Sequence, residues 1–316
     1  MRDDLPYAAL PQMPKTGARH AWGVFGADDE LGTLNFITPE AVRNALRSAT
    51  AGRVVNLNLP LDVPQPSLIP GREAYRHGVA VRRFGRDDWL DRFYLQASSQ
   101  WDSLRHIRYR EFGYYGGREE EDLDTSPVLG IQVMAARGIV ARGVLLDVAG
   151  YRERRGDPVP ATERVGFGPD LLEEVAAAEG VDLVAGDVLL VRTGWLRWYL
   201  DRTEAERRAL AGALDATFRC PGVESGEATA AWLWDHRIAA LAADNPAVEA
   251  LPVEPERGFL HRWLIPLLGM PLGELWDLEA LAGVCREAGR YAFLLVSAPL
   301  NLPGGVGSPA NAYAIF

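Results

Sequence analysis

Cysteine and long apolar runs are scarce in this chain of 316 residues. Cys220 and Cys285 are the only cysteines, too few for a disulfide framework or a cysteine zinc cluster. No apolar run approaches the roughly 18 residues that a membrane span requires. The N-terminal sequence Met1-Arg2-Asp3-Asp4 lacks the apolar segment of a secretory signal. We therefore expect a cytoplasmic protein that does not enter a membrane.

Basic residues are also fewer than acidic ones. The 33 Lys and Arg residues are outnumbered by 43 Asp and Glu residues, which gives a net charge of −10. A nucleic-acid-binding protein should present a basic face, so we do not expect a nucleic-acid partner. The chain has no glycine-rich dinucleotide fingerprint, no phosphate-binding loop and no Gly-x-Ser-x-Gly elbow. No nucleotide cofactor is therefore expected.

Strands and helices alternate irregularly along the chain, which predicts a single α/β domain. Residues 1–35 are rich in Pro, Gly and charge, and we expect them to form an N-terminal arm on a domain of residues 36–316. A similar mixture of Gly and acidic residues predicts a mobile loop over residues 110–125. Periodicity predicts strands at 53–62, 77–81, 93–102, 138–148, 186–195, 238–243 and 291–297. It predicts helices at 38–49, 170–178, 203–217, 225–236, 260–268 and 278–288.

The chemistry is predicted to lie in residues 93–106, where an apolar strand gives way to small polar residues. On a strand, alternate side chains share a face, so Gln96, Gln100 and Asp102 are expected to point the same way. His106 follows four residues after Asp102. An imidazole that titrates near neutrality suits proton transfer, and a neighbouring carboxylate can orient it. His20, His77, His236 and His261 are expected to be surface or packing residues.

This stretch resembles the signature of the cyclase family, which includes bacterial kynurenine formamidase and isatin hydrolase. The signature, His-x-Gly-Thr-His-x-Asp-x-x-x-His, begins at Gln96, and its Asp and last His fall on Asp102 and His106. The Thr falls on Ser99, and the second His falls on Gln100. Later segments match in order, among them residues 138–147, 186–194, 221–223, 243–245, 273–275 and 299–309. The chain looks closest to a long subgroup with Gln-Trp-Asp in place of His-x-Asp.

The resemblance implies a fold, an assembly and a metal. The fold would be the swivelling β/β/α architecture of the family, assembled as a dimer or tetramer. In the family the first two His and the Asp hold a divalent metal, which here would place it on Gln96, Gln100 and Asp102. Amide oxygens are weak ligands that suit Mn²⁺ or Mg²⁺ better than Zn²⁺, so the metal would be weakened or absent. Glu224 and Glu227 lie near the place of a further acidic ligand.

The resemblance implies a hydrolase that opens or closes a small amide, imide, lactone or ester. His106 would be the general acid/base, with Asp102 and Gln100 as the other catalytic residues. Ser99, Trp101 and Tyr115 are the residues expected to contact the small-molecule substrate. Two alternatives stay open at this point. One is a metal-free cyclase, isomerase or lyase that uses His106 and Asp102, and the other is a binding protein without activity.

Overall fold

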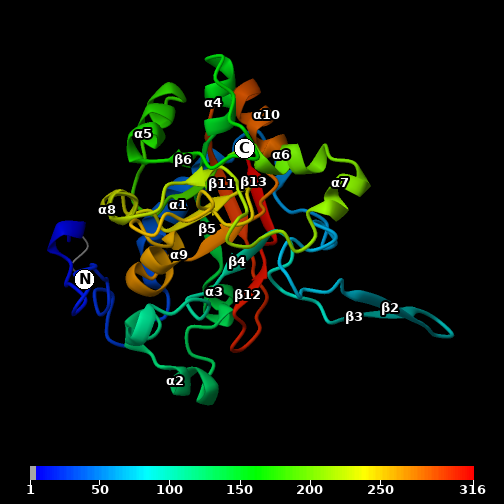
Figure 1. Ribbon diagram of the computed structural model, residues 1–316, viewed down its shortest axis with the longest axis horizontal. Helices are drawn as coiled ribbons and strands as arrows, with labels where there is room; N and C mark the ends of the chain where they lie inside the picture. Colours follow the sequence, from blue (N-terminus) through cyan, green and yellow to red (C-terminus); the bar gives the residue numbers. More distant parts are fainter. Residues whose placement is uncertain (1–4) are drawn as a thin grey trace.

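A mixed sheet of nine strands forms the centre of the protein in a computed structural model, which describes residues 5–316 (Figure 1). Its strand order is β1-β13-β11-β5-β7-β9-β10-β4-β12. The strands of this sheet are β1 (Val54–Asn56), β4 (Gln100–Asp102), β5 (Ile139–Leu146), β7 (Val188–Val191), β9 (Ala240–Ala243), β10 (Leu272–Glu274), β11 (Ala292–Ser297), β12 (Gly307–Pro309) and β13 (Ala312–Ile315). Two small sheets pair β2 (Arg76–Val81) with β3 (Arg86–Asp91) and β6 (Gly166–Phe167) with β8 (Gly222–Val223).

The middle of the sheet is parallel and the flanks are antiparallel. Strands β5, β7, β9 and β10 run parallel to one another, whereas β5 pairs antiparallel with β11 and β10 pairs antiparallel with β4. Every residue of β7 and β9 is buried, in keeping with the continuous apolar sequence of these strands. The α/β architecture predicted from the sequence is confirmed. Within residues 5–316 we find no helix with the length and apolar character that crossing a bilayer would require.

Helices surround this sheet (Figure 1). They are α1 (Pro39–Ser48), α2 (Glu120–Thr125), α3 (Ile131–Arg137), α4 (Val148–Arg154), α5 (Pro169–Ala178), α6 (Trp195–Leu200), α7 (Glu204–Ala209), α8 (Glu227–Asp235), α9 (Leu260–Arg262) and α10 (Glu279–Ala288). Single turns are η1 (Tyr7–Ala9), η2 (Gly32–Phe36), η3 (Arg110–Phe112), η4 (Tyr115–Gly117) and the π-helical η5 (Trp263–Leu268). Helix α1 begins where predicted, because Thr38 Oγ1 accepts from the amide of Ala41 at 3.2 Å and Pro39 follows it.

The N-terminal segment is attached to the body through buried contacts. The amide of Tyr7 donates to Asp235 Oδ1 at 2.7 Å, and the indole of Trp22 donates to the carbonyl of Pro266 at 2.6 Å. Leu34 is buried in the main core. These contacts join the segment to α8 and η5. A boundary near residue 35 stays a prediction.

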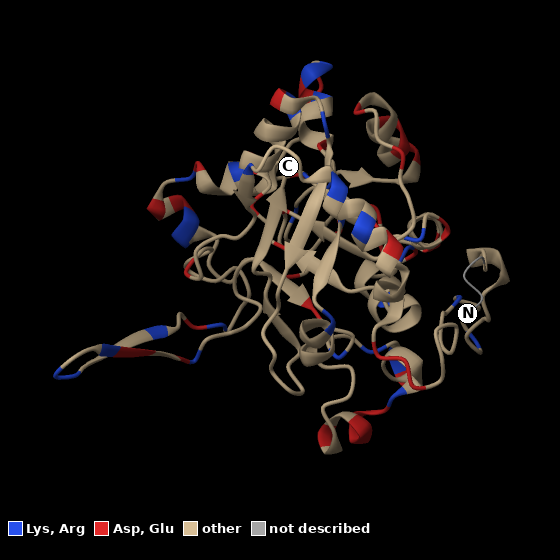
Figure 2. Cartoon of the chain, turned by 180° about the vertical axis from the view of Figure 1, so that it is seen from behind, with Lys and Arg blue, Asp and Glu red and all other residues tan. Residues whose placement is uncertain are grey.

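The β2–β3 hairpin extends away from the body, as Figure 1 shows. Charges of both signs lie along it (Figure 2). Several large apolar side chains are exposed there, among them Val81 at 73%, Phe84 at 90% and Trp89 at 54%. The sequence analysis predicted only the first of the two strands. Neither strand has a buried face, so the second gave no alternating pattern.

Three other predictions about local structure were wrong. The strand expected over residues 93–102 is limited to Gln100–Asp102, so alternation along a strand does not place Gln96. The acidic run expected in a mobile loop forms α2, where Glu119 and Asp122 make a capping box. The helix expected over residues 203–217 ends at Ala209 and is followed by turns, among them Gly212 with φ of +65°.

Glu179 makes the fold sensitive to pH. The carboxylate is buried beside β5 and accepts from the amide of Asp147 at 3.2 Å. Burial, together with the charge of Asp147, raises the pKa of Glu179 to about 8. The folded state thus holds this proton more tightly than the unfolded chain, whose carboxyl titrates near 4.5. The resulting stability is complete below pH 4.5 and is lost as the pH rises through about 8.

We expect Glu179→Gln to remove this dependence. The variant should match the wild type in free energy of unfolding near pH 4.5 and exceed it by about 2 kcal/mol at pH 9. Urea denaturation at the two pH values measures the difference. A difference that is the same at both pH values would contradict the assignment.

Candidate active site

Strand β4 holds three of the predicted site residues, Gln100, Trp101 and Asp102, in the interior of the sheet. It pairs antiparallel with β10 on one side and with β12 on the other. The register sets Gln100 opposite Glu274, and the Gln100 amide nitrogen donates to Glu274 Oε2. The side chain of Trp276, packed over Gly273, donates to the carbonyl of Gln100 at 3.0 Å. Gln100 and Asp102 are therefore buried and fixed by the strands around them.

Gln96 reaches the same place from the turn before β4. Its amide nitrogen donates to Asp102 Oδ1 and lies 3.3 Å from Nδ1 of His106. Gly307 in β12 makes room for this arrangement, since a Cβ there would lie 2.6 Å from Cγ of Gln96. The structure thus brings Gln96, Asp102 and His106 together, as the sequence predicted, although through a turn rather than a continuous strand.

His261 occupies the centre of the cluster, where sequence analysis placed no functional residue. Its Nδ1 lies 2.7 Å from Glu249 Oε2. Its Nε2 lies 3.2 Å from Glu274 Oε1 and 3.7 Å from Asp102 Oδ2. The imidazole stacks on the ring of Phe259, with a centroid separation of 4.6 Å. One buried imidazole therefore sits among three buried carboxylates.

Burial and neighbouring charges both shift the pKa values of the residues in this cluster. Burial disfavours a charged His261, but the charge of Glu249 and hydrogen bonds to the surrounding carboxylates outweigh it and raise the pKa of His261 well above 6.5. Burial also opposes ionisation of Asp102, yet His106, His261 and Gln96 hold the pKa of Asp102 below its usual value. For Glu274 burial prevails, and its pKa rises to about 7. The centre of the cluster favours a cation.

Three of these side chains also fit a divalent metal ion. Asp102, His261 and Glu274 each offer a ligand atom, and these atoms lie within 4.8 Å of one another. Asp102 Oδ2 and Gln100 Oε1 are buried without a hydrogen-bond partner, which is costly unless something else satisfies them. Glu249 on Nδ1 would orient His261 so that Nε2 faces the metal, as carboxylates do at many metal sites. One imidazole and two carboxylates suit Zn²⁺ or Mn²⁺.

His106 lies at the edge of the cluster and is partly accessible. Its side chain is 26% exposed, whereas that of Asp102 is 1% exposed. The Nε2 of His106 lies 3.9 Å from Asp102 Oδ1. Burial lowers the pKa of His106, and the charge of Asp102 opposes this shift. The imidazole is thus placed between the buried carboxylates and the solvent.

The other residues predicted to contact the substrate lie outside the cluster. Ser99 is buried, donates to the carbonyl of Leu275 and accepts from the amide of Leu59 at 2.9 Å. Trp101 is fully buried and donates to Ser297 Oγ at 2.9 Å. Tyr115 is 1% exposed and donates to Asp29 Oδ2 at 3.0 Å. Each of the three fixes the fold around the site.

The two acids considered as further ligands also lie elsewhere. Glu224 forms an ion pair with Arg164 at 2.5 Å, and Glu227 is exposed in the first turn of α8. Glu274, which belongs to the cluster, appeared in the sequence only within a matched turn. His261 offered one local signal, because it and Arg262 interrupt an otherwise apolar stretch from Phe259 to Leu268. That signal does not identify its partners.

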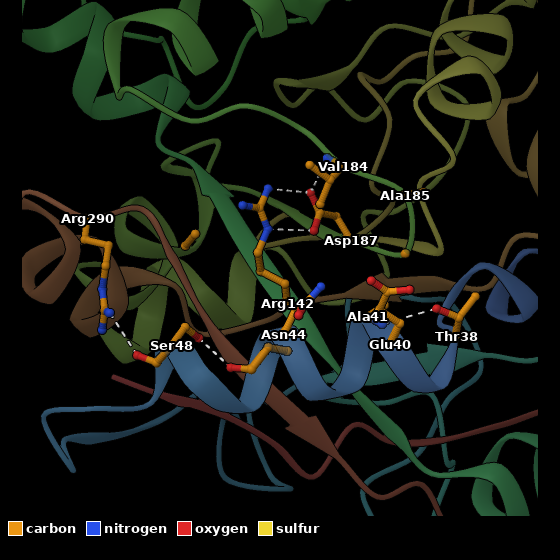
Figure 3. A pocket seen from close by; sticks show the side chains of 13 residues that line it. Thr38, Glu40, Ala41, Asn44, Ser48, Arg142, Val184, Ala185, Asp187 and Arg290 are labelled. Atoms are coloured by element: carbon orange, nitrogen blue, oxygen red, sulfur yellow. Dashed lines mark hydrogen bonds and ion pairs between the residues drawn. The ribbon is translucent and has the colours of Figure 1, made fainter.

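A separate cavity of about 580 Å³ lies between α1 and the sheet (Figure 3). Its two arginines already have partners. Arg142 makes two contacts of 2.8 Å with the carboxylate of Asp187, and Arg290 donates to the carbonyl of Ser48 at 2.8 Å. Strands β7, β9 and β10 separate β5, which carries Arg142, from β4 in the sheet order. This cavity is therefore distinct from the cluster around Asp102.

The whole chain resembles a known family and several solved structures. A family model described as "Putative cyclase" matches residues 55–250. A crystal structure of a novel cyclase is 32% identical, with a TM-score of 0.81, over 94% of this chain and 99% of that one. Isatin hydrolase A from Labrenzia aggregata, bound to benzyl benzoate, is 16% identical with a TM-score of 0.60, over 86% and 98% of the chains.

Isatin hydrolase A from Ralstonia solanacearum is also 16% identical, with a TM-score of 0.58. The match covers 88% of this chain and 97% of that one. At this level of identity the two isatin hydrolases show a shared fold. A search of curated proteins found no match.

Proposed function

The chain belongs to the cyclase family, and from this premise we propose that it hydrolyses a small amide, imide, lactone or ester. The family supports a hydrolase or cyclase type of activity. The observation that carries the proposal is the convergence of Asp102, His261 and Glu274 within 4.8 Å, with the partly exposed His106 beside them. Buried carboxylates around an imidazole are costly for a fold, so we attribute them to function.

Asp102, His261 and Glu274 are the residues that would hold a divalent metal ion. Gln100 would contribute its unpartnered Oε1, and the Gln96 amide would hold Asp102 in place. This proposed set differs from the set implied by the family signature, which was Gln96, Gln100 and Asp102. A bound ion would polarise the substrate carbonyl and make a water molecule more acidic.

His106 is the proposed general acid/base. The Gln96 amide engages Nδ1, so Nε2 is the ring atom available for proton transfer. It would take a proton from the attacking water and return it to the nitrogen or oxygen that leaves. The acyl carbon gains the water oxygen and its bond to the leaving atom breaks, which gives a carboxylic acid. This acid then loses the second proton of the water to solvent or to the released amine and becomes a carboxylate. Asp102 would stabilise the charged form of the imidazole meanwhile.

The proposal is tested by metal analysis together with turnover on a panel of small imides, lactones, anilides and esters. We expect about one metal ion per chain and turnover that chelation abolishes. His106→Asn should lower turnover by on the order of 10² to 10⁴ while the metal stays bound. His236→Asn, which changes a surface imidazole paired with Glu173, is the matched control.

Two results would replace this proposal. Turnover that resists chelation in a metal-free protein would favour a metal-free cyclase, isomerase or lyase. A protein that contains no metal and turns over no member of the panel, yet binds small ligands, would favour a binding function.

We further propose a homo-oligomer, supported by the apolar side chains on the β2–β3 hairpin. A lone two-stranded hairpin is marginal in water, and exposed apolar groups of this size usually mark a contact. Replacing residues 78–89 by Asn-Gly would shorten the hairpin to a two-residue turn. Sedimentation analysis should show a dimer or larger assembly for the wild type and a smaller one for this variant. A monomeric wild type would overturn the assignment.

A further inference from the structure

A pair of short parallel strands brings two helix N-termini to one cavity. Strand β6 pairs with β8 so that Phe167 lies opposite Val223. After β6 the chain enters α5 through Gly168, and after β8 it enters α8 through the turn of residues 224–226. Because the carboxyl ends of parallel strands lie at the same edge, both helices begin there. Their first residues line a cavity of about 640 Å³, together with residues of the N-terminal segment, η3 and the segment before α9.

The first-turn amides of these two helices lack acceptors. Among residues 5–316, no side chain caps the N-terminus of α5 or of α8, whose N-cap residues are Gly168 and Gly226. The same part of the chain offers no acceptor to the amides of residues 170–171 and 226–229. The positive end of each helix dipole adds an attraction for negative charge. This edge therefore presents N–H donors from two helices to one cavity.

Two buried hydroxyl groups beside these amides also lack partners. Ser225 is 3% exposed and lines the cavity, and its Oγ has no hydrogen-bond partner in the part of the chain that the structure describes. Thr229 in the first turn of α8 is 1% exposed and lines the same cavity, and its hydroxyl forms no hydrogen bond within residues 5–316. A buried hydroxyl without a partner is costly, and a ligand oxygen would remove this cost. Both groups therefore indicate a ligand with several acceptor oxygens.

Two arginines and three acidic residues also line the cavity. The arginines are Arg110, which is exposed and forms no ion pair among the described residues, and Arg257. Of the acids, Glu224 pairs with Arg164 at 2.5 Å and lies 3.6 Å from Arg257. The other two, Glu227 and Glu256, are exposed. Within residues 5–316, none of the three carboxylates accepts from the free amides of α5 and α8, so those donors are open to an anion.

We propose that the edge formed by the N-termini of α5 and α8 binds a phosphate group. A phosphate carries about two negative charges at neutral pH and several acceptor oxygens, which match the amides and the two hydroxyl groups. The side chains of Tyr109 and Trp263 line the same cavity and would contact a small apolar body attached to the phosphate. Asp102, His261 and Glu274 are not part of this lining. The inference is therefore a second site that goes beyond the proposed function.

The test is calorimetric titration of the full chain with inorganic phosphate, phenyl phosphate and the neutral analogue phenol. The protein is chelated first, so that no metal ion can hold the probes. We expect phenyl phosphate to bind at least tenfold more tightly than phenol, since the phosphate has hydrogen bonds to several donors. Ser225→Ala should weaken the binding of both phosphates by roughly tenfold, because it removes a hydrogen bond to a charged group.

Ser225→Asp should abolish the binding of both phosphates, because a carboxylate beside the free amides would occupy their place. Thr38→Asp is the matched control, since it makes a similar change at the N-terminus of α1, where the Thr38 hydroxyl already accepts from the amide of Ala41. This variant should bind both phosphates with the affinity of the wild type. Thermal unfolding checks that each variant folds. If Ser225→Asp does not fold, the affinity of Ser225→Ala decides.

The order of the two phosphate affinities identifies the source of the phosphate group. Tighter binding of phenyl phosphate than of inorganic phosphate would indicate a small phosphomonoester, and equal or weaker binding would indicate free phosphate. Absence of binding by either phosphate would overturn the site, as would wild-type affinity in the folded Ser225→Ala or Ser225→Asp variant. The readout does not depend on turnover or on a bound metal, so failure of the proposed hydrolase activity leaves this site untouched.

Discussion

Replacement of His261 by alanine is expected to lower the free energy of unfolding by about 3 to 5 kcal/mol, because it leaves buried carboxylates without their cationic partner. The imidazole lies within 3.7 Å of oxygens from Glu249, Glu274 and Asp102, and its side chain is 3% exposed. No other described imidazole contacts three buried carboxylates in residues 5–316. The alanine variant should also fail to hold the proposed metal ion, since it lacks the only nitrogen ligand of the candidate set.

Urea denaturation and elemental analysis of the same samples measure the two effects. His236→Ala is the matched control, because His236 lies outside the cluster and pairs with Glu173 at 3.1 Å. Its free energy of unfolding and its metal content should equal those of the wild type. A His261→Ala protein within about 1 kcal/mol of the wild type would show that the buried carboxylates do not depend on this imidazole.

Replacement of Asp102 by asparagine is expected to lower turnover by on the order of 10³ and to remove the metal, while the fold survives. Asparagine has nearly the same shape, so the packing of β4 between β10 and β12 is retained. The variant loses the negative charge that faces both His106 and His261. The amide oxygen of asparagine can still accept from the Gln96 amide, so the loss is that of the charge.

Steady-state kinetics on the best substrate of the panel, with metal analysis, measures this result. Glu227→Gln serves as the comparison, because it removes an exposed acid that the sequence had made a candidate ligand. Glu227→Gln should keep both metal and turnover. Full activity in Asp102→Asn would refute the role of β4 in the reaction and shift attention to Glu249 and Glu274.

Local sequence pattern is enough to predict several parts of this protein. Apolar runs without polar interruption specify β7 and β9 as central strands, because a strand buried on both faces needs no polar side. The Thr-Pro start of α1 is equally local, since the Thr38 hydroxyl satisfies an amide three residues away. The short spacing from Gln96 to His106 likewise predicted that these two side chains lie close together.

The rest of the site depends on contacts between segments that are far apart in the sequence. Antiparallel pairing of β4 with β10 sets Glu274 opposite Gln100, although 173 residues lie between them in the sequence. Packing of α9 then places His261 against Glu249, Glu274 and Asp102. No periodicity within the chain encodes these contacts, because each depends on the register of strands that are remote in sequence. The family signature has His at the positions of Gln96 and Gln100, and the imidazole of the candidate metal site comes instead from His261, which the fold brings close to Asp102.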